Sequence, residues 1–291
     1  MVPKKILVTG AGGQLGKELR TLESLFPDFQ FLFFSRDELP IEKEIEIELV
    51  FRKENPSYCI NCAAYTAVDK AESDKNNAFM INAQAVQSLA KICHAVSCRF
   101  IHISTDYVFD GNSSKPLQED DRTSPINVYG ESKLRGEELA QSEDPDVLII
   151  RTAWVYSEFG NNFVKTMIRL MKERDSVNVI NDQIGSPTYA ADLAAAILKI
   201  CGAEKFVPGI FHYSNAGRIS WYDFACAIKE LTGSVCKVNP IPSSAYPTAA
   251  RRPNYSLLNT ARITSTYSLT IPEWKNSLVK CLERIRMQGL V

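Results

Sequence analysis

The chain has 291 residues, of which 45% are hydrophobic and 23% charged, and its formal net charge is -1. This balance is typical of an ordinary soluble protein with one large or two modest cores, and it gives no reason to expect nucleic acid or an anionic membrane as a partner. The sequence contains neither a signal peptide nor an apolar stretch long enough to span a membrane, so we expect a cytoplasmic protein.

Eight cysteines are scattered along the chain, without the density of a disulfide scaffold. Cys59 and Cys62 form a CxxC motif in a strand-like run, where residues three apart point to opposite faces, which argues against a shared metal or a redox pair. We therefore expect buried free thiols. The three histidines have no HExxH-like spacing and no GxSxG motif is present, so zinc and serine hydrolases have no support.

A glycine-rich turn follows the first apolar run, residues 5–8, and leads into a helical pattern over residues 17–26. A strand, a turn and a helix start in this order can bind a pyrophosphate, because bare backbone lets the anion approach and free N–H groups hold it. A Walker A loop is excluded, since Ala11 and Glu18 occupy two of its required positions. A turn without a ligand is the alternative. The expected cofactor contacts in the turn Gly10-x-x-Gly13-x-x-Gly16 are Gly10, Gly12, Gly13, Gln14 and Leu15.

The second expected strand, residues 30–34, ends at Ser35 and Arg36. In a dinucleotide fold this position meets the adenosine ribose, where an acid accepts from the 2'-hydroxyl and an arginine meets a 2'-phosphate. Because no acid stands at Ser35, the pair favours NADP, while an arginine that is merely solvated at a strand end is the alternative.

Helices and apolar strands then alternate, which indicates a parallel sheet covered on both faces, with ligands at the carboxyl ends of the strands. Thr105 ends one such strand, so its hydroxyl could reach Tyr129 and a substrate oxygen. The expected elements are helices at 44–55 and 74–96, and strands at 58–64, 100–105 and 147–152.

A helix that begins near Val128 places Tyr129 and Lys133 four residues apart on one face. An ammonium beside a phenol favours phenolate, so the pKa of Tyr129 should fall below its usual value of about 10. Such a tyrosine could act as the general acid for a carbonyl or alcohol near neutral pH. Since the spacing is common by chance, an ordinary surface helix with a solvated lysine is the alternative, and the motif depends on its context.

The second half of the chain is less regular. We expect a helix after Phe163, a polar turn at 182–188, helices at 190–201 and 220–231, and a strand at 210–214. The predicted fold is an α/β doubly wound parallel sheet, Rossmann-like. A smaller α/β substrate domain is expected to cover the ligand cleft at the carboxyl ends of the strands. The dinucleotide domain is placed at residues 1–153 and the substrate domain mainly at 154–291, with some segments returning to the sheet.

Three motifs together resemble the extended short-chain dehydrogenase/reductases. They are Thr9-Gly10-x-x-Gly13-x-x-Gly16, residues 104–109 and Tyr129-x-x-x-Lys133. Residues 62–72, 125–130, 160–167 and 182–188 narrow the resemblance to the dTDP-4-dehydrorhamnose reductases, and it runs over nearly the whole chain. It implies hydride transfer from NAD(P)H to the 4-keto carbon of dTDP-4-dehydro-L-rhamnose, which gives dTDP-L-rhamnose for polysaccharide biosynthesis.

The resemblance also implies roles for individual residues. Tyr129 would protonate the forming alkoxide, Lys133 would hold the nicotinamide ribose and lower the tyrosine pKa, and Thr105 would supply a supporting hydroxyl. Implied cofactor contacts outside the glycine turn are Ser35, Arg36, Ala63, Ala64, Tyr65, Ser104, Tyr129 and Lys133. Implied substrate contacts are Thr105, Asp106, Tyr107, Trp154, Asn162 and Arg252. Trp154 directly follows the strand at 147–152, which favours stacking on a sugar over a place in the core.

Two positions depart from the family pattern. Pro40 stands where the family often has an aspartate, which removes a carboxylate contact to adenine, and Ser35 replaces a common acid. We therefore expect NADP(H) to be preferred and NAD(H) to be possible. Some family members are dimers bridged by magnesium, but no ligands can be assigned in this chain, so Mg²⁺ and the choice between monomer and homodimer stay open. The alternatives are a non-catalytic relative, such as the regulatory β subunit of methionine adenosyltransferase, and a reductase or epimerase of another nucleotide sugar.

Overall fold

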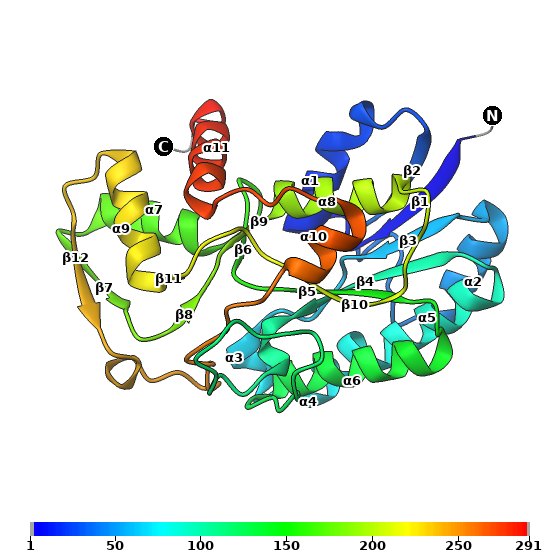
Figure 1. Cartoon of the computed structure of the whole chain (residues 1–291), viewed down its shortest axis with the longest axis horizontal. Coiled ribbons are helices and arrows are strands. Elements are labelled where there is room, and N and C mark those ends of the chain that lie inside the picture. The colour runs from blue at the N-terminus through cyan, green and yellow to red at the C-terminus, as the bar shows by residue number, and fades with distance from the viewer. Residues whose placement is uncertain (1–2, 290–291) are drawn as a thin grey trace.

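A six-stranded parallel sheet forms the centre of the larger lobe (Figure 1). The computed structural model describes residues 3–289. Residues 1–2 of the predicted dinucleotide domain and residues 290–291 of the predicted substrate domain lie outside this range. In sheet order the strands are β10 (Gly209–Tyr213), β5 (Leu148–Thr152), β4 (Arg99–Thr105), β3 (Tyr58–Asn61), β1 (Lys4–Thr9) and β2 (Phe29–Phe34). All neighbouring pairs are parallel, which confirms the predicted doubly wound sheet.

Helices cover both faces of this sheet, so its strands are largely apolar. Ile6 and Val8 of β1 pack into one buried cluster, and Leu7 between them packs into another on the opposite face. Each fully buried aliphatic side chain contributes about 1.5–3 kcal/mol. One face carries α1 (Gln14–Leu22) and α8 (Ala190–Gly202), and the other carries α2 (Glu44–Glu54), α5 (Ala85–Ala95) and α6 (Val128–Glu143) (Figure 1).

The strand order reverses between β1 and β3, and a crevice opens at this switch point. The backbone of Gly10 has φ +65°, and a Cβ there would lie 2.5 Å from the backbone nitrogen of Ala63. Glycine is therefore required at position 10, both for the left-handed conformation and for the close approach of the two strand ends.

The helix predicted at 74–96 is interrupted by a π turn, Met80–Gln84, between α4 (Lys75–Phe79) and α5. This turn presents the Asn82 amide to the Tyr65 backbone, accepting from its N–H at 2.8 Å and donating to its carbonyl at 3.0 Å. Asn82 Nδ2 also donates to Ser132 Oγ on α6 at 2.9 Å. Turns of this kind often occur near functional sites, and here the π turn ties the segment after β3 to α6.

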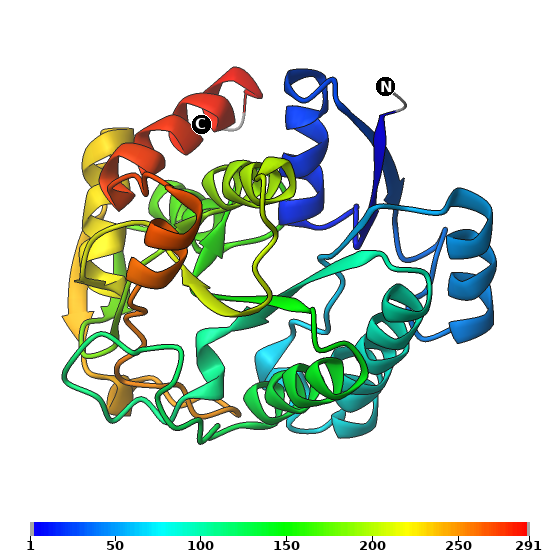
Figure 2. The same ribbon diagram turned by 45° about the vertical axis from the view of Figure 1, so that its right-hand side comes forward.

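The smaller lobe lies to one side of the central sheet (Figure 2). Its own core includes Tyr156, Met167, Phe224 and Leu278. Its helices are α7 (Phe163–Glu173), α9 (Trp221–Thr232) and α11 (Trp274–Met287). Its strand pairs are β7 (Ser176–Ile180) with β12 (Lys237–Ile241), β8 (Ile184–Gly185) with β11 (Ile219–Ser220), and β6 (Val155–Tyr156) with β9 (Thr188–Tyr189). The short helices α3 (Val68–Ala71) and α10 (Ala261–Tyr267) complete the chain. The sequence analysis did not identify α3, α10, α11, β6, β7, β11 or β12, and it predicted a polar turn at 182–188, where β8 lies.

The eight cysteines are free thiols, and six of them are buried as predicted, whereas Cys62 and Cys226 are partly exposed. Cys59 packs into the cluster on one face of the sheet and Cys62 against the cluster on the other, so the CxxC spacing does not bring the two sulfurs together. Within residues 3–289, no group of three or more His, Cys, Asp or Glu residues could hold a metal ion. None of the helices in that range combines the length and the apolar character needed to cross a membrane.

Candidate active site

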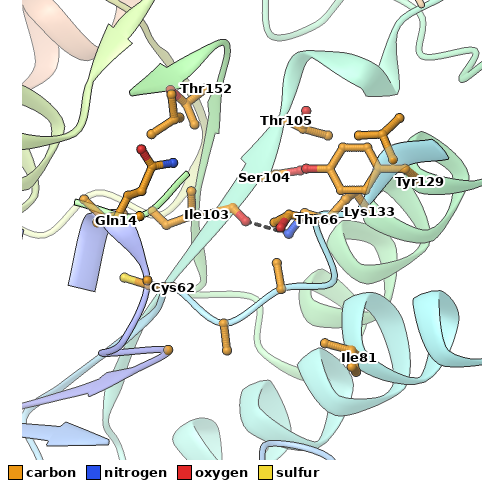
Figure 3. A pocket seen from close by; sticks show the side chains of 18 of the residues that line it. Gln14, Cys62, Thr66, Ile81, Ile103, Ser104, Thr105, Tyr129, Lys133 and Thr152 are labelled. Atoms are coloured by element: carbon orange, nitrogen blue, oxygen red, sulfur yellow. Dashed lines mark hydrogen bonds between the residues drawn. The ribbon is translucent and has the colours of Figure 1, made fainter. Parts of the chain in front are cut away.

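A cavity of about 630 Å³ lies over the carboxyl ends of the central strands (Figure 3). Most of the predicted site residues line it: Gly10, Gly13, Gln14, Leu15, Arg36, Ala63, Ala64, Ser104, Thr105, Asp106, Tyr107, Tyr129, Lys133 and Trp154. Residues that the sequence analysis missed include Cys62, Thr66, Ile81, Thr152 and Asn161. Cys62 and Thr152 stand at strand ends, a position that could have identified them, whereas nothing in the sequence marks Ile81.

The glycine turn is shaped to receive a pyrophosphate. Gly13 precedes the first turn of α1, and no side chain within residues 3–289 caps that helix start, which leaves N–H groups for an anion. A Cβ at Gly16 would lie 2.6 Å from Ala11 Cα, so α1 can pack this closely on the turn only with glycine there. Together with the cavity below it, the turn fits a dinucleotide cofactor.

The expected ribose end of the cofactor site contains an acid that the sequence analysis overlooked. The carboxylate of Glu38 accepts from the backbone N–H of Ser35 at 2.8 Å, and this hydrogen bond lowers the pKa of Glu38. The sequence analysis considered only position 35 itself, where serine replaces the acid, and did not consider Glu38. Arg36 is largely exposed and lies 3.6 Å from Glu42. Gly12 and Ser35 line a smaller second cavity that also contains Lys17, Arg20 and Glu38.

Tyr129 and Lys133 share one face of α6, whose first turn is capped by the Asn127 side chain accepting from the backbone N–H of Gly130 at 2.8 Å. The pKa of Tyr129 is raised to about 12, mainly by burial. The hydrogen bond with the Thr105 hydroxyl lowers this pKa, and the charge of the Asp106 carboxyl raises it. The predicted lowering of this pKa is therefore wrong for the free protein.

Lys133 does not offset this effect of burial, because its side chain is engaged with the backbone of β4. Its Nζ donates to the carbonyl of Ile103 at 2.6 Å (Figure 3), beneath the cavity floor. Burial, which disfavours the charged amine, lowers the pKa of Lys133 to about 8. Tyr129 consequently keeps its proton, and a phenol is the form that a general acid needs in a reduction.

The Thr105 hydroxyl, the Asp106 carboxyl and the Tyr107 ring lie around Tyr129. The Thr105 hydroxyl donates to Asp106 Oδ1 at 3.0 Å, and burial raises the pKa of Asp106 to about 6. Asp106 Oδ2 is buried without a hydrogen bond to the described part of the chain, although the nearby Ser256 hydroxyl lowers the pKa of the carboxyl. The Tyr107 ring lies edge-on to Tyr129, with centroids 5.5 Å apart. The free carboxyl oxygen of Asp106 is suited to accept a substrate hydroxyl.

Ser104, a predicted cofactor contact, lines the cavity, but its hydroxyl donates to the buried carboxylate of Glu137. Tyr65 is also a predicted cofactor contact, but its hydroxyl donates a hydrogen bond to Asp74 Oδ2 at 3.0 Å. It does not line the main cavity, whereas the neighbouring Thr66 does.

Asn162 caps α7 by accepting from the backbone N–H of Lys165 at 3.2 Å. Its Nδ2 donates to Gln14 Oε1 at 2.9 Å and to the carbonyl of Ser157 at 2.7 Å. Asn162 itself lines a separate surface cavity and not the main one. It is connected to the main cavity by its hydrogen bond to Gln14, which lines that cavity.

A larger cavity of about 1130 Å³ extends from Tyr107 into the smaller lobe. Arg252 lies in its wall and forms a two-point ion pair with Asp69, at 2.7 and 3.1 Å. Other lining residues are Phe163, Arg174, Trp221, Tyr246 and Arg251. The two cavities share Tyr107, so a ligand that extends from one to the other would pass this residue.

Trp154 directly follows β5 and lines the main cavity, but one face of its indole is already stacked on Trp221, with centroids 3.7 Å apart. Its backbone adopts φ +49°, a conformation that costs a bulky residue about 1–3 kcal/mol and persists mainly at functional sites. The stacking partner within the protein is thus Trp221. Contact between Trp154 and a sugar stays a prediction.

We expect Trp154→Ala to lower kcat/KM and also the thermal unfolding temperature, because the indole both lines the cavity and packs on Trp221. Loss of an aromatic stack costs about 0.5–1.5 kcal/mol of stability beyond the lost burial. Trp274→Ala is the control, since it removes an indole that packs on Phe224 in the smaller lobe and lines neither the main cavity nor the larger one. If both variants lose stability but keep the kcat/KM of the wild-type enzyme, Trp154 belongs to the core and not to the site.

The parallel sheet, the glycine turn at its switch point, and Thr105 beside the Tyr129–Lys133 pair define a nicotinamide-dependent oxidoreductase of the extended short-chain type. The family model described as "RmlD substrate binding domain" matches residues 4–287. The dTDP-4-dehydrorhamnose reductase of Escherichia coli (strain K12) is 41% identical over 291 residues, covering 96% of this chain and 97% of that relative.

Solved structures agree. A dTDP-4-dehydrorhamnose reductase from Clostridium acetobutylicum is 40% identical, with a TM-score of 0.93 over 97% of this chain and 100% of that chain. The enzyme from Bacillus anthracis, solved in complex with NADP, is 37% identical, with a TM-score of 0.93 over 97% of this chain and 99% of that chain. This chain therefore belongs to the dTDP-4-dehydrorhamnose reductase family of oxidoreductases, which confirms the resemblance and disfavours a non-catalytic relative.

Proposed function

We propose that this chain reduces the 4-keto group of dTDP-4-dehydro-L-rhamnose with NAD(P)H to give dTDP-L-rhamnose, as its relatives' names indicate for them. The observation that carries the proposal is the convergence of Thr105, Tyr129 and Lys133 on one cavity beneath the glycine turn. Two further expectations from the sequence belong with it, namely a cytoplasmic location and a monomer or homodimer in which Mg²⁺ is possible.

The chemistry divides between the cofactor and the chain. When bound, the reduced nicotinamide supplies a hydride to the keto carbon. Tyr129 donates its phenolic proton to the carbonyl oxygen, on which negative charge develops. The Thr105 hydroxyl stabilises the same oxygen by donating a hydrogen bond to it. Lys133 lies one helical turn beyond Tyr129, where it would hold the nicotinamide ribose.

The nucleotide part of the substrate fits the larger cavity beyond Tyr107. Arginine side chains at Arg174 and Arg251 could meet a diphosphate, and the rings of Phe163 and Tyr246 could pack against a base. The sugar would then lie at Tyr107, with its keto group directed to Tyr129.

The test follows oxidation of NADPH and NADH with a panel of dTDP-4-keto-6-deoxysugars and with matching UDP-sugars. We expect the highest kcat/KM for dTDP-4-dehydro-L-rhamnose. A higher kcat/KM for another dTDP-4-keto sugar would transfer the assignment to that sugar. Absence of turnover with all of them would overturn the proposal.

The choice of cofactor should depend on two opposed charges near Ser35. Arg36→Ala should lower the ratio of kcat/KM for NADPH over NADH, because a charge-assisted contact to the 2'-phosphate contributes about 1.5–3 kcal/mol, or roughly 10- to 100-fold. Glu38→Gln should raise the ratio, since the Glu38 carboxylate beside Ser35 repels a phosphate. If neither substitution moves the ratio, the 2'-phosphate does not bind here.

A further inference from the structure

The side chain of Asn127 joins the first turn of α6 to a backbone segment 124 residues further along the chain. Asn127 Oδ1 accepts from the backbone N–H of Gly130 at 2.8 Å, and Asn127 Nδ2 donates to the carbonyl of Arg251 at 2.7 Å. A backbone N–H can only donate and a backbone carbonyl can only accept, so these two contacts fix which atom of the amide is the oxygen. Asn127 is 4% exposed, so the protein, and not water, satisfies its amide.

Tyr129 lies inside the helical turn that Asn127 caps. Because the first turn of a helix has N–H groups without partners in the helix, a cap there restrains the residues that follow it. The phenol of Tyr129 is hydrogen-bonded to the Thr105 hydroxyl, and the turn packs tightly, since a Cβ at Gly130 would collide with the carbonyl oxygen of Tyr107. A small displacement of this turn would therefore move the phenol away from Thr105 and from the substrate oxygen.

The segment that Asn127 contacts belongs to the wall of the larger cavity. Arg251 and Arg252 line this cavity, and the residues just before Ala250 are exposed. Asp69 anchors the segment to α3 by its ion pair with Arg252 and by accepting from the backbone N–H of Ala250 at 3.1 Å. Asn127 anchors the same segment to α6. Exposed segments of this kind are where ligand binding commonly changes local order.

We propose that Asn127 is a positioning residue that couples occupation of the larger cavity by the substrate's nucleotide to the placement of Tyr129. A diphosphate held by the Arg251 side chain restrains the Arg251 backbone, and the Asn127 amide carries this restraint to the turn that contains Tyr129. Binding energy from a part of the substrate that does not react is thereby used to orient the general acid. The proposal deepens the proposed function and rests on its placement of the nucleotide in this cavity.

Substitutions at Asn127 can separate the helix cap from the link to the cavity wall. Aspartate and serine cap helices about as well as asparagine. Aspartate, however, presents a second acceptor to the Arg251 carbonyl, and the shorter serine side chain has no amide to reach it. The start of α6 also keeps an anchor outside this link, since Glu72 accepts from the backbone N–H of Val128 at 2.8 Å. Both variants should therefore fold with α6 intact, which thermal unfolding checks.

The first test measures hydrogen exchange of the Gly130 and Glu131 amides by NMR in the NADP⁺ complex, with and without saturating dTDP. We expect dTDP to slow both exchange rates about 10-fold or more in wild type, and to slow them less than about twofold in Asn127→Asp and Asn127→Ser. Binding of dTDP to wild type without a change in exchange would overturn the coupling alone. If dTDP does not bind, the placement of the nucleotide is wrong and the coupling falls with it, so the two failures are distinguishable without turnover.

The second test is steady-state kinetics of the reduction. Both Asn127 variants should lower kcat about 10- to 100-fold, since displacing a reacting group by about 1 Å can cost 100-fold. Because the two residues act through one link, Asn127→Ser should cost much less in an Arg251→Ala background than in wild type. The control is Asn259→Ser, which changes an asparagine that accepts from the Ala261 N–H at the start of α10 and lines neither the main nor the larger cavity. Wild-type kcat in both folded Asn127 variants, or additive losses in the double variant, would contradict the proposal.

Discussion

Replacing Tyr129 with phenylalanine is expected to reduce kcat about 100- to 10,000-fold, the usual contribution of a general acid. The phenolic hydroxyl is the only part of the side chain removed, so the lost interaction belongs to the transition state and KM should change little. The ring contact with Tyr107 is kept, and the variant should unfold at nearly the wild-type temperature. Steady-state kinetics with NADPH and the preferred sugar, together with thermal unfolding, provide the measurement.

The matched control is Tyr222→Phe, which removes a hydroxyl from α9 in the smaller lobe, outside the main cavity. Because the pKa of Tyr129 is raised to about 12, its proton is present throughout the neutral range. Ionisation of Tyr129 should therefore produce no fall in the reduction rate between about pH 6 and 9. Near-wild-type turnover by folded Tyr129→Phe would remove the catalytic assignment.

The central sheet could be predicted from the sequence because its strands are buried on both faces. Strands β1, β2, β4 and β5 begin and end within one residue of the predicted positions, since continuous apolar runs leave little freedom. The run after Pro56 was predicted to extend to Ala64, but β3 ends at Asn61, where the chain turns into the cavity wall. The smaller lobe was harder, because two-residue strands such as β6 and β8 form no periodic pattern.

The site could be predicted as a set of strand ends and turns, but the hydrogen bonds of its side chains could not. The spacing of Tyr129 and Lys133 places both on one face of α6, yet it does not reveal that the Lys133 amine also contacts the Ile103 carbonyl and His102. Glu38 was missed for a similar reason. It stands three residues after Ser35, and only the turn after β2 brings its carboxylate back to the Ser35 N–H.

Beneath the site, a buried ion pair between Arg151 of β5 and Glu137 of α6 joins the sheet to the catalytic helix. Arg151 Nε donates to both carboxylate oxygens, at 3.0 and 3.1 Å, and Nη2 adds a third hydrogen bond at 2.7 Å. Both side chains are nearly inaccessible, at 3% and 2% exposure. The Ser104 hydroxyl donates to the same carboxylate, so the pair also orients a residue of the cavity wall.

Arg151→Met is expected to lower the free energy of unfolding by about 3–5 kcal/mol, because it leaves the Glu137 carboxylate buried without its counter-charge. For a chain of this size that corresponds to a fall of roughly 6–20 °C in Tm. Differential scanning calorimetry or chemical denaturation provides the measurement. The control is the double variant Arg151→Met with Glu137→Leu, which removes both charges and should recover much of the loss, since apolar replacement of a buried pair is often close to neutral. If the double variant is no more stable than the single one, the lost stability reflects packing around Arg151 and not an uncompensated charge.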